Sequence, residues 1–292
     1  MIKMRKIKFS LPKTTVLLLM LLSFIFMGFP VIIMIFTSFK SMEETILSNF
    51  SILPQQWNII NFKNAFENAD WGRYFTNSIF ITVIVVAASL LCSSLAGYSL
   101  ARLKFRGNNL IFLLFLAGIM IPPQAYIVPQ YIIVRSIPFA GGNNIFGVGG
   151  TGWLNTYNAL IFPFIAAPVG IFLCKQFYTT FPQSLDEAAK IDGCSLWGIY
   201  RNIYLPMSKP IFATFAILKF SYTWNDFFYP LIMTDSKKLY TVQIALQKFK
   251  DVGGVQWNYL MAATLITILP IMLVFIAAQK YFIQGIVTTG IK

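Results

Sequence analysis

The chain has 292 residues, of which 57% are hydrophobic and only 11% are charged. Soluble globular domains carry about 25% charged residues, so this composition argues against a water-soluble protein and is typical of an integral membrane protein. The formal net charge of +13 does not indicate nucleic-acid binding, because the basic residues are spread over short segments between apolar stretches and form no single patch.

Several kinds of catalytic or metal site are disfavoured by the residue inventory. The chain has no histidine and three cysteines, Cys92, Cys174 and Cys194, which form no CxxC motif. Histidine is the commonest general base and metal ligand, so we predict no metal site, no disulfide and no catalytic residue. No GxxxxGK[ST] motif occurs either, so we expect no ATP site of that type in this chain.

The first predicted element is an apolar segment at residues 16–36 that follows a basic N-terminal stretch. It exceeds the apolar core of a signal peptide, which is roughly 7–15 residues long, and no small-x-small cleavage site follows it. We therefore predict an uncleaved transmembrane helix whose N-terminus is cytoplasmic.

Five further apolar segments predict transmembrane helices at residues 79–100, 110–134, 157–177, 211–231 and 259–282. The third span is interrupted by Pro122-Pro123 and by Pro129. The short connection at 101–109 carries three basic residues and no acidic one, which places it on the cytoplasmic side. No polar interval is long enough to fold separately. The prediction is an all-α membrane protein with six spans, both termini cytoplasmic and one transmembrane domain over residues 1–292.

A glycine-rich segment at 147–152 satisfies the pattern GxGxxG of dinucleotide-binding proteins. That function requires a preceding strand and a following amphipathic helix within a βαβ unit, and the flanking sequence predicts neither. We interpret the segment as a turn between two spans.

The longest polar interval with helical periodicity runs over residues 181–210, between the fourth and fifth spans. Pro182 can open a helix in which Leu185, Ala188 and Ala189 share one face, and Gly193 can end it in a left-handed conformation. Ser195 can cap a second helix, which Pro206 and Pro210 would close. Two helices this short are unstable alone in water, so they must dock against the span ends or against another protein.

The spacing within this interval resembles the EAA loop of ABC-importer permeases, through Glu187-Ala188-Ala189, Gly193 and Ile203-x-Leu205-Pro206. The resemblance implies the type I importer permease fold, in which the loop is a cytoplasmic two-helix coupling element that docks on an ATPase subunit. The residues it implies for ATPase coupling are Glu187, Ala188, Ala189, Asp192, Gly193, Ile203, Leu205 and Pro206. The glutamate is expected to pair with a basic residue of the ATPase.

Flanking segments resemble the maltose-G-like permeases of carbohydrate importers. They are Ser38-Phe39-Lys40, Asn77-Ser78, Trp224-Asn225-Asp226-Phe227 and the C-terminal segment 279–285, in which Gln284 and Gly285 are implied as a tail contact with the ATPase. The loop 233–258, with Gly253-Gly254, either reaches the sugar site of a binding protein or is a simple connector.

The family implies a set of partners for a non-catalytic membrane subunit. These are a second permease subunit in a heterodimer, two ATPase subunits, an extracellular solute-binding protein, a carbohydrate and the lipid membrane, with no nucleic acid. No cofactor is expected on this chain, because ATP and Mg²⁺ would be bound by the ATPase subunits.

A polar stripe in the fifth span is the predicted translocation pathway. Lys219, Tyr222, Thr223 and Asp226 follow helical spacing, and Asn225 lies beside them. An ammonium inside a span is costly unless it faces water or a partner. The alternatives are a structural Lys–Asp pair or a lysine that extends to the interface.

Three other functions remain possible. One is an ABC permease for a non-sugar solute. The second is a secondary transporter, for which Asp226 is the one candidate coupling acid within the spans. The third is a membrane enzyme, but its only acidic cluster would be Asp186, Glu187 and Asp192, which we interpret as docking charges.

Overall fold

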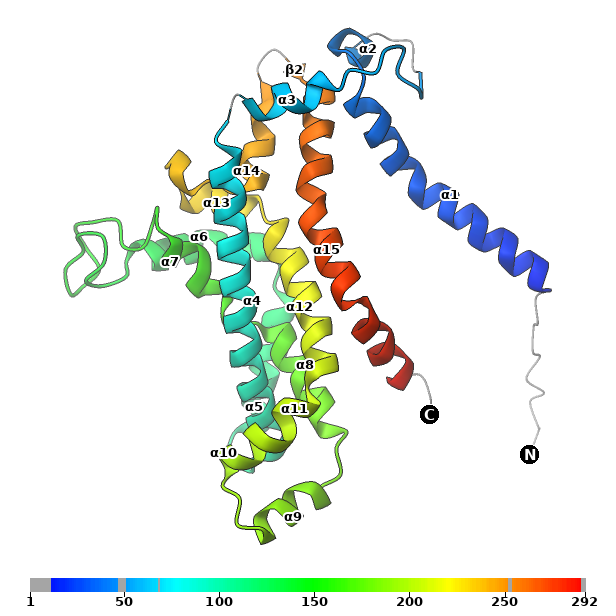
Figure 1. Cartoon of the computed structure of the whole chain (residues 1–292). Helices are drawn as coiled ribbons and strands as arrows, with labels where there is room; N and C mark the ends of the chain where they lie inside the picture. The colour runs from blue at the N-terminus through cyan, green and yellow to red at the C-terminus, as the bar shows by residue number, and fades with distance from the viewer. Residues whose placement is uncertain (1–11, 47–50, 68, 252–253, 290–292) are drawn as a thin grey trace, which may run out of the picture. The chain divides into compact units, whose positions relative to one another are not determined.

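The computed structural model describes residues 12–46, 51–67, 69–251 and 254–289, with side chains of 251 and 280–289 outside the description. The chain divides into two compact units, Met1–Ala69 with Lys248–Thr267 and Asp70–Gln247 with Ile268–Lys292. Figure 1 shows the elements of both units, and each unit is described here by itself. The prediction of one domain stays a prediction.

The first unit contains α1 (Lys13–Ser38), α2 (Met42–Ile46), α3 (Ile60–Glu67), the strand pair β1 (Lys250–Asp251) and β2 (Gly254–Val255), and the beginning of α15 (Trp257–Thr289). The apolar side chains of α1 are largely exposed, as expected of a helix that contacts lipid. Asn61 of α3 caps the end of α1, because its Nδ2 donates to the carbonyls of Ser38 and Lys40 over 2.9 and 2.8 Å.

The second unit contains the remaining helices. In chain order they are α4 (Trp71–Arg102), α5 (Asn108–Met120), α6 (Pro123–Arg135), α7 (Tyr157–Ile161), η1 (Phe162–Phe164), α8 (Pro168–Thr179), α9 (Ser184–Ile191), α10 (Leu196–Ile199), the π-helix η2 (Tyr200–Tyr204), α11 (Leu205–Met207), α12 (Lys209–Trp224), α13 (Phe228–Met233), η3 (Lys237–Leu239) and α14 (Val242–Leu246). The 3₁₀ turn η4 (Gln247–Phe249) follows at the boundary between the units.

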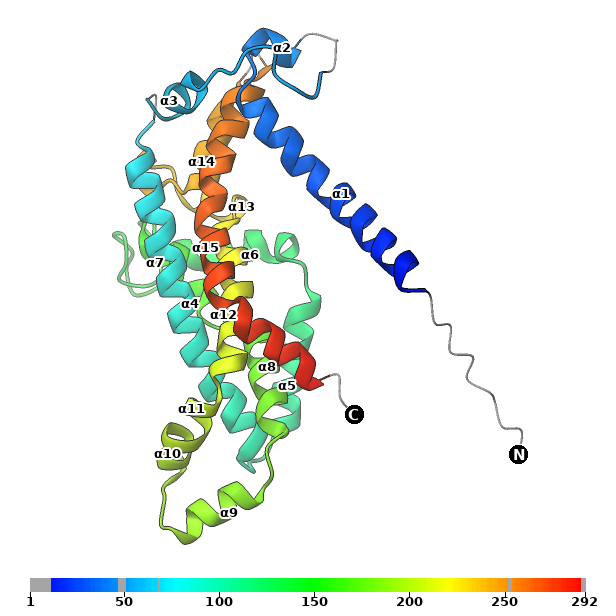
Figure 2. The ribbon, with the colours of Figure 1, turned by 45° about the vertical axis from the view of Figure 1, so that its right-hand side comes forward.

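The centre of the second unit is a bundle in which α4 packs against α8 and α12. Both views show these helices side by side (Figures 1 and 2). A Cβ at Gly97 of α4 would lie 2.5 Å from the Cβ of Cys174 on α8, so only glycine allows this close approach of the two backbones. Small residues serve this purpose in membrane helices, where dispersion contacts drive association.

Four helical segments in the described chain are long and apolar enough to cross a membrane: Lys13–Ser38, Trp71–Arg102, Tyr157–Thr179 and Trp257–Gln279. The predicted third span is broken, since α5 and α6 meet at an angle of 108°. Pro122 and Pro123 lie at this break, where proline removes backbone donors. The predicted fifth span is divided between α12 and α13. The count of six spans therefore stays a prediction.

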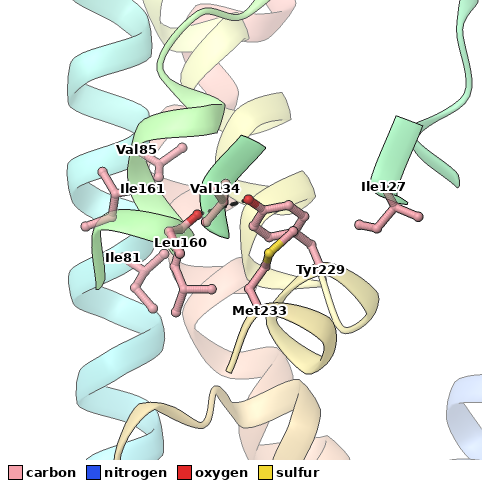
Figure 3. Close-up of a cluster of buried hydrophobic side chains, with 9 residues drawn as sticks. Ile81, Val85, Ile127, Val134, Leu160, Ile161, Tyr229 and Met233 are labelled. Carbon is pink, nitrogen blue, oxygen red and sulfur yellow. Dashed lines mark hydrogen bonds between the residues drawn. The ribbon is translucent and has the colours of Figure 1, made fainter. Parts of the chain in front are cut away.

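A cluster of buried apolar side chains holds α13 in place. Tyr229 and Met233 of α13 pack with Leu160 and Ile161 of α7 and with Ile81 and Val85 of α4, and Ile127 and Val134 of α6 complete the cluster. Figure 3 shows these side chains, with the Tyr229 hydroxyl directed at the α7 backbone. This hydroxyl donates to the carbonyl of Ala159 over 3.1 Å. The contacts hold the start of α13, and hence Asp226 just before it, against the bundle.

Candidate functional site

The helix α9 is the first half of the predicted coupling loop. It begins at Ser184, so Pro182 lies before the helix and does not open it as predicted. Asp186 and Glu187 lie in its first turn, where the helix dipole favours negative charge. Gly193 follows the helix with φ of 76°. The amides of Gly193 and Cys194 donate to the carbonyls of Lys190 and Ala189, which is the Schellman arrangement, so the predicted left-handed stop is confirmed.

The second half of the loop differs from the prediction. Ser195 caps α10 as expected, with its Oγ accepting from the amide of Gly198 over 3.1 Å. The chain then continues through η2 and α11 and, after Ser208, into α12. Pro206 and Pro210 therefore do not end the helix. Each lies at the first turn of α11 or α12, where a missing amide hydrogen costs little.

A cluster of buried tyrosines docks the loop onto the ends of α4 and α8. Tyr98 and Tyr178 come from those helices, and Tyr200 and Tyr204 come from η2. The hydroxyl of Ser94 lies 2.7 Å from that of Tyr178 and 2.9 Å from that of Tyr200. The short helices are thus stabilised by tertiary contacts, in agreement with the prediction that they must dock.

The coupling residues inferred from the sequence are not all on one surface. Glu187, Ala188, Asp192, Gly193 and Pro206 are exposed, Ile203 and Leu205 are half-buried, and Ala189 is buried. Leu185, Ala188 and Ala189 all lie in α9 as predicted, but Ala188 is exposed and Ala189 is buried, so the two alanines do not present one surface to a partner. Leu185 and Ala189 turn inward because only a narrow i, i+4 stripe of so short a helix contacts the bundle.

The loop also exposes large apolar side chains. Ile191 is 86% exposed and Trp197 is 58% exposed. Large apolar side chains exposed beside charged residues are typical of protein contact surfaces.

Asp186, the residue before Glu187, forms contacts that the sequence did not indicate. Its carboxylate accepts from the Tyr204 hydroxyl at 2.9 and 3.0 Å and lies 3.4 Å from Nε of Arg102, the last residue of α4. Arg102 also donates to the carbonyl of Phe181 over 2.6 Å. The interpretation of Asp186 as an exposed docking charge is therefore wrong, because its side chain is largely buried.

The predicted pathway residues lie at the end of α12 and in the turn before α13. Lys219 is 9% exposed, and its Nζ lies 5.3 Å from the ring centre of Phe164 and 5.5 Å from that of Tyr222. No ion pair within 4.0 Å joins Lys219 to Asp226 in the described chain, so the alternative of a direct Lys–Asp pair is not supported. Oδ1 of Asp226 accepts from the amide of Tyr229 instead, over 3.2 Å.

A pocket of about 310 Å³ brings three of these residues together with α6. Tyr222, Asn225 and Asp226 form one side, and Gln124, Tyr126 and Gln130 of α6 form another. Sequence reasoning missed the α6 residues. A signal was present, because the two glutamines follow Pro123 and Pro129 within an apolar segment, and helices broken at membrane depth often line a cavity. Lys219 and Thr223 do not line this pocket.

Asn77 and Ser78, which suggested a carbohydrate-type permease, are buried and make structural contacts. Asn77 donates to the carbonyls of Lys238 and Tyr240 over 2.9 Å, and accepts from the Tyr157 hydroxyl over 2.7 Å. Ser78 accepts from the amide of Val242 over 2.9 Å. They fix the segment after α13 to α4. Gln284 and Gly285 lie within α15, but their side chains are outside the described residues.

No group of three or more Cys, His, Asp or Glu side chains that could hold a metal ion occurs among the residues that the structure describes. The candidate functional site thus has two parts, neither of them a metal site. One is the docked loop with the exposed Glu187, and the other is the polar pocket between α6 and α12.

The chain is similar to known proteins over most of its length. Residues 89–288 match the family described as binding-protein-dependent transport system inner membrane component. The chain is 33% identical to the probable ABC transporter permease protein YurM of Bacillus subtilis, over 98% of this chain and 90% of that protein. It is 34% identical to the arabinooligosaccharides transport system permease protein AraQ of Halalkalibacterium halodurans, over 90% and 91% of the two chains.

The fold is also that of a solved permease. A chain from the crystal structure of a bacterial ABC transporter involved in the import of the acidic polysaccharide alginate superimposes with a TM-score of 0.76, at 20% identity, over 92% of this chain and 95% of that one. The family match covers more than half of the sequence. The chain therefore belongs to the binding-protein-dependent transport system inner membrane components, the multi-pass permease subunits of ABC importers.

Proposed function

We propose that this chain is a permease subunit of an ATP-driven importer of a carbohydrate, an oligosaccharide or related sugar, and forms half of the translocation pathway. The observation that carries the proposal is the coupling loop, which is docked on the span ends with Glu187 left exposed. The similarity to a permease named for arabinooligosaccharides supports the substrate class.

The exposed side of α9 would bind an ATPase subunit. Glu187 would pair with a basic residue of that subunit, and Ile191 and Trp197 would be covered in the contact. The shape of the loop would depend on Gly193, while Asp192, Ile203, Leu205 and Pro206 would support the contact. Two such ATPase subunits would bind ATP and Mg²⁺ and hydrolyse ATP, so this chain would have no catalytic role of its own.

The pocket between α6 and α12 would line the pathway for the sugar. Amide and phenol groups can hydrogen-bond to sugar hydroxyls, and aromatic rings can stack on sugar faces. Gln124, Gln130 and Asn225 supply amides, while Tyr126 and Tyr222 supply phenols. The volume of about 310 Å³ is at the lower end of the range for ligand sites, which suits one or two sugar rings at a time.

Lys219 and Thr223 do not line this pocket, so they would influence it indirectly. Thr223 Oγ1 is buried and has no hydrogen-bond partner in the described chain, and it lines a cavity of about 10 Å³ together with Asp226. Both residues would adjust the charge and polarity of the pathway, with no direct contact with substrate in the present conformation.

The remaining partners follow from the family. We propose a second permease subunit as a heterodimeric partner. We also propose an extracellular solute-binding protein, which the family description supports. Both termini would be cytoplasmic, and the tail at Gln284 and Gly285 would contact the ATPase subunits.

A second candidate is a permease for an anionic solute. Lys219 is buried near the pocket, and the solved transporter of similar fold imports an acidic polysaccharide. However, Asp226 lines the pocket and Lys219 does not. A carboxylate repels an anionic substrate, so an uncharged sugar is favoured.

The deciding experiment is uptake of radiolabelled sugars by the complete complex in liposomes. The expected result is uptake of a neutral oligosaccharide that requires internal ATP and the binding protein. Uptake driven by an ion gradient without ATP would instead identify a secondary transporter, and preference for a uronate oligomer would favour the anionic candidate.

A further inference from the structure

The end of α4 is joined to the coupling loop by one ionic contact. Nε of Arg102 lies 3.4 Å from Oδ2 of Asp186, and a second guanidinium nitrogen donates to the carbonyl of Phe181 over 2.6 Å. Arg102 therefore contacts both α9 and the turn that precedes it. Among the ion pairs of the described residues, this one joins segments distant in sequence, whereas the other two link residues three or four positions apart.

The contact is shielded from water. The side chain of Arg102 is 7% exposed and that of Asp186 is 16% exposed. The Tyr204 hydroxyl donates to the same carboxylate, and its ring lies 5.3 Å from the Arg102 guanidinium carbon. A buried carboxylate that loses its cation is left with an uncompensated charge, so this contact resists separation far more than an exposed ion pair does.

The apolar residues of α9 that turn inward are Leu185, which is half-buried, and Ala189. Ala189 is its one buried residue. Apolar contacts allow a short helix to slide or rotate, whereas the hydrogen bond from Tyr204 to Asp186 and the buried ion pair with Arg102 define one orientation. Glu187, the next residue, is exposed. The first of the two adjacent acids is thus bound to the end of α4, while the second remains exposed.

We propose that Arg102 and Asp186 are positioning residues that make α9 move together with α4, so that force applied by an ATPase at Glu187 is transmitted to the bundle. This inference rests on the proposed function. The transmission is mechanical: α4 packs against α12, whose C-terminal end carries the pocket residue Tyr222. A loop attached only by apolar contacts could follow the ATPase without moving the pathway.

The test compares Arg102→Gln, Asp186→Asn and the double variant in the full complex in liposomes. The matched control is Arg201→Gln, an exposed arginine of the same loop. We expect each single variant to assemble with the ATPase and hydrolyse ATP, while the sugar transported per ATP falls about tenfold. The double variant should be no worse than either single one, because the two residues act through one contact. Arg201→Gln should retain the wild-type ratio.

A second measurement does not depend on transport. Amide hydrogen exchange over residues 184–194 in the assembled complex should become about tenfold faster in Asp186→Asn and stay unchanged in Arg201→Gln. Absence of ATP-driven uptake by the wild-type complex would overturn the proposed function, even if the exchange result holds. Three results would overturn the positioning role: an unchanged transport ratio in Asp186→Asn, failure of that variant to bind the ATPase, or additive losses in the double variant.

Discussion

Asp186 and Glu187 are adjacent in α9, yet only the Asp186 carboxylate is bound within the fold. The Asp186 carboxylate accepts the hydrogen bond of the Tyr204 hydroxyl, which lies close to both its oxygens, and forms an ion pair with Arg102, whereas Glu187 is exposed. Neighbouring helical positions differ by about 100° in direction, so one acid can hold the loop while the other remains available for a partner.

The availability of Glu187 leads to a first prediction. Glu187→Arg should leave the protein in the membrane but abolish ATP hydrolysis linked to transport, because a like charge at a contact costs several kcal/mol. Glu187→Gln should have an intermediate effect. The measurement is sugar-stimulated ATPase activity of the purified complex, with Arg201→Gln as the control. Wild-type coupling in Glu187→Arg would show that this carboxylate makes no essential contact.

Gly193 allows a prediction about the shape of the loop. Its φ of 76° is strained for any other residue, although no atom lies within 4 Å of an added Cβ. Gly193→Ala should destabilise the turn by about 1 kcal/mol, and Gly193→Pro, which also loses the amide contact to Lys190, by about 3 kcal/mol or more. Hydrogen exchange in α9 would measure both effects. Gly198→Ala within α10 is the control and should change little, so an equal effect there would argue against strain at 193.

The charged residues of the fifth-span region give a third prediction. Lys219→Met and Asp226→Asn should each lower the maximal rate of transport about tenfold, because each removes a charge at or near the pocket that would line the pathway. Uptake in liposomes is the measurement. The control is Leu218→Val, which alters an exposed apolar residue beside Lys219. Wild-type rates in both charge variants would refute the assignment of this stripe to the pathway.

The amides of α6 should affect substrate affinity. Gln124→Leu and Gln130→Leu each remove a group that can bond to a sugar hydroxyl, a loss of about 1 kcal/mol or roughly fivefold in apparent affinity. Both line the pocket with Asp226. Concentration dependence of uptake should show a higher half-saturation value, with the maximal rate less affected. Ile133→Ala changes an exposed α6 side chain that does not line the pocket and should leave affinity unchanged. If it weakens uptake equally, α6 acts through its packing alone.

Tyr204 gives a prediction about pH. Burial, and then the hydrogen bond to Asp186, raise the pKa of Tyr204 above its usual value of 10.0. The neutral hydroxyl therefore stabilises the folded loop fully below pH 10, and this contribution is lost only as the pH rises through the elevated pKa. A nitroxide on the exposed Cys194, in a Cys92→Ala background, should gain mobility only above pH 10. In Tyr204→Phe this alkaline transition should disappear, and its persistence would exclude Tyr204 as the titrating group.

Local features of the sequence determined much of the fold. The apolar segments predicted the helices α1 and α4 and the spans that include α8 and α15. The left-handed turn at Gly193 and the cap at Ser195 were also predicted correctly. Each of these depends on the residues within one helix or turn, through hydropathy, helix capping or glycine geometry.

Only the tertiary structure decided which side chains meet. Helical periodicity assigned Ala188 and Ala189 to one face, but contact with the bundle buried Ala189 alone. The proline pair at 122–123 indicated an interruption, yet the angle of 108° that brings Gln124 and Gln130 to Asp226 depends on packing against other helices. The contact of Arg102 with Asp186 joins the end of α4 to α9, with α5, α6, α7 and α8 between them in the sequence. Local conformation depends on neighbouring residues and can be read from the sequence. The contacts of a polar side chain such as Asp186 involve residues distant in the sequence, which come together only in the folded structure.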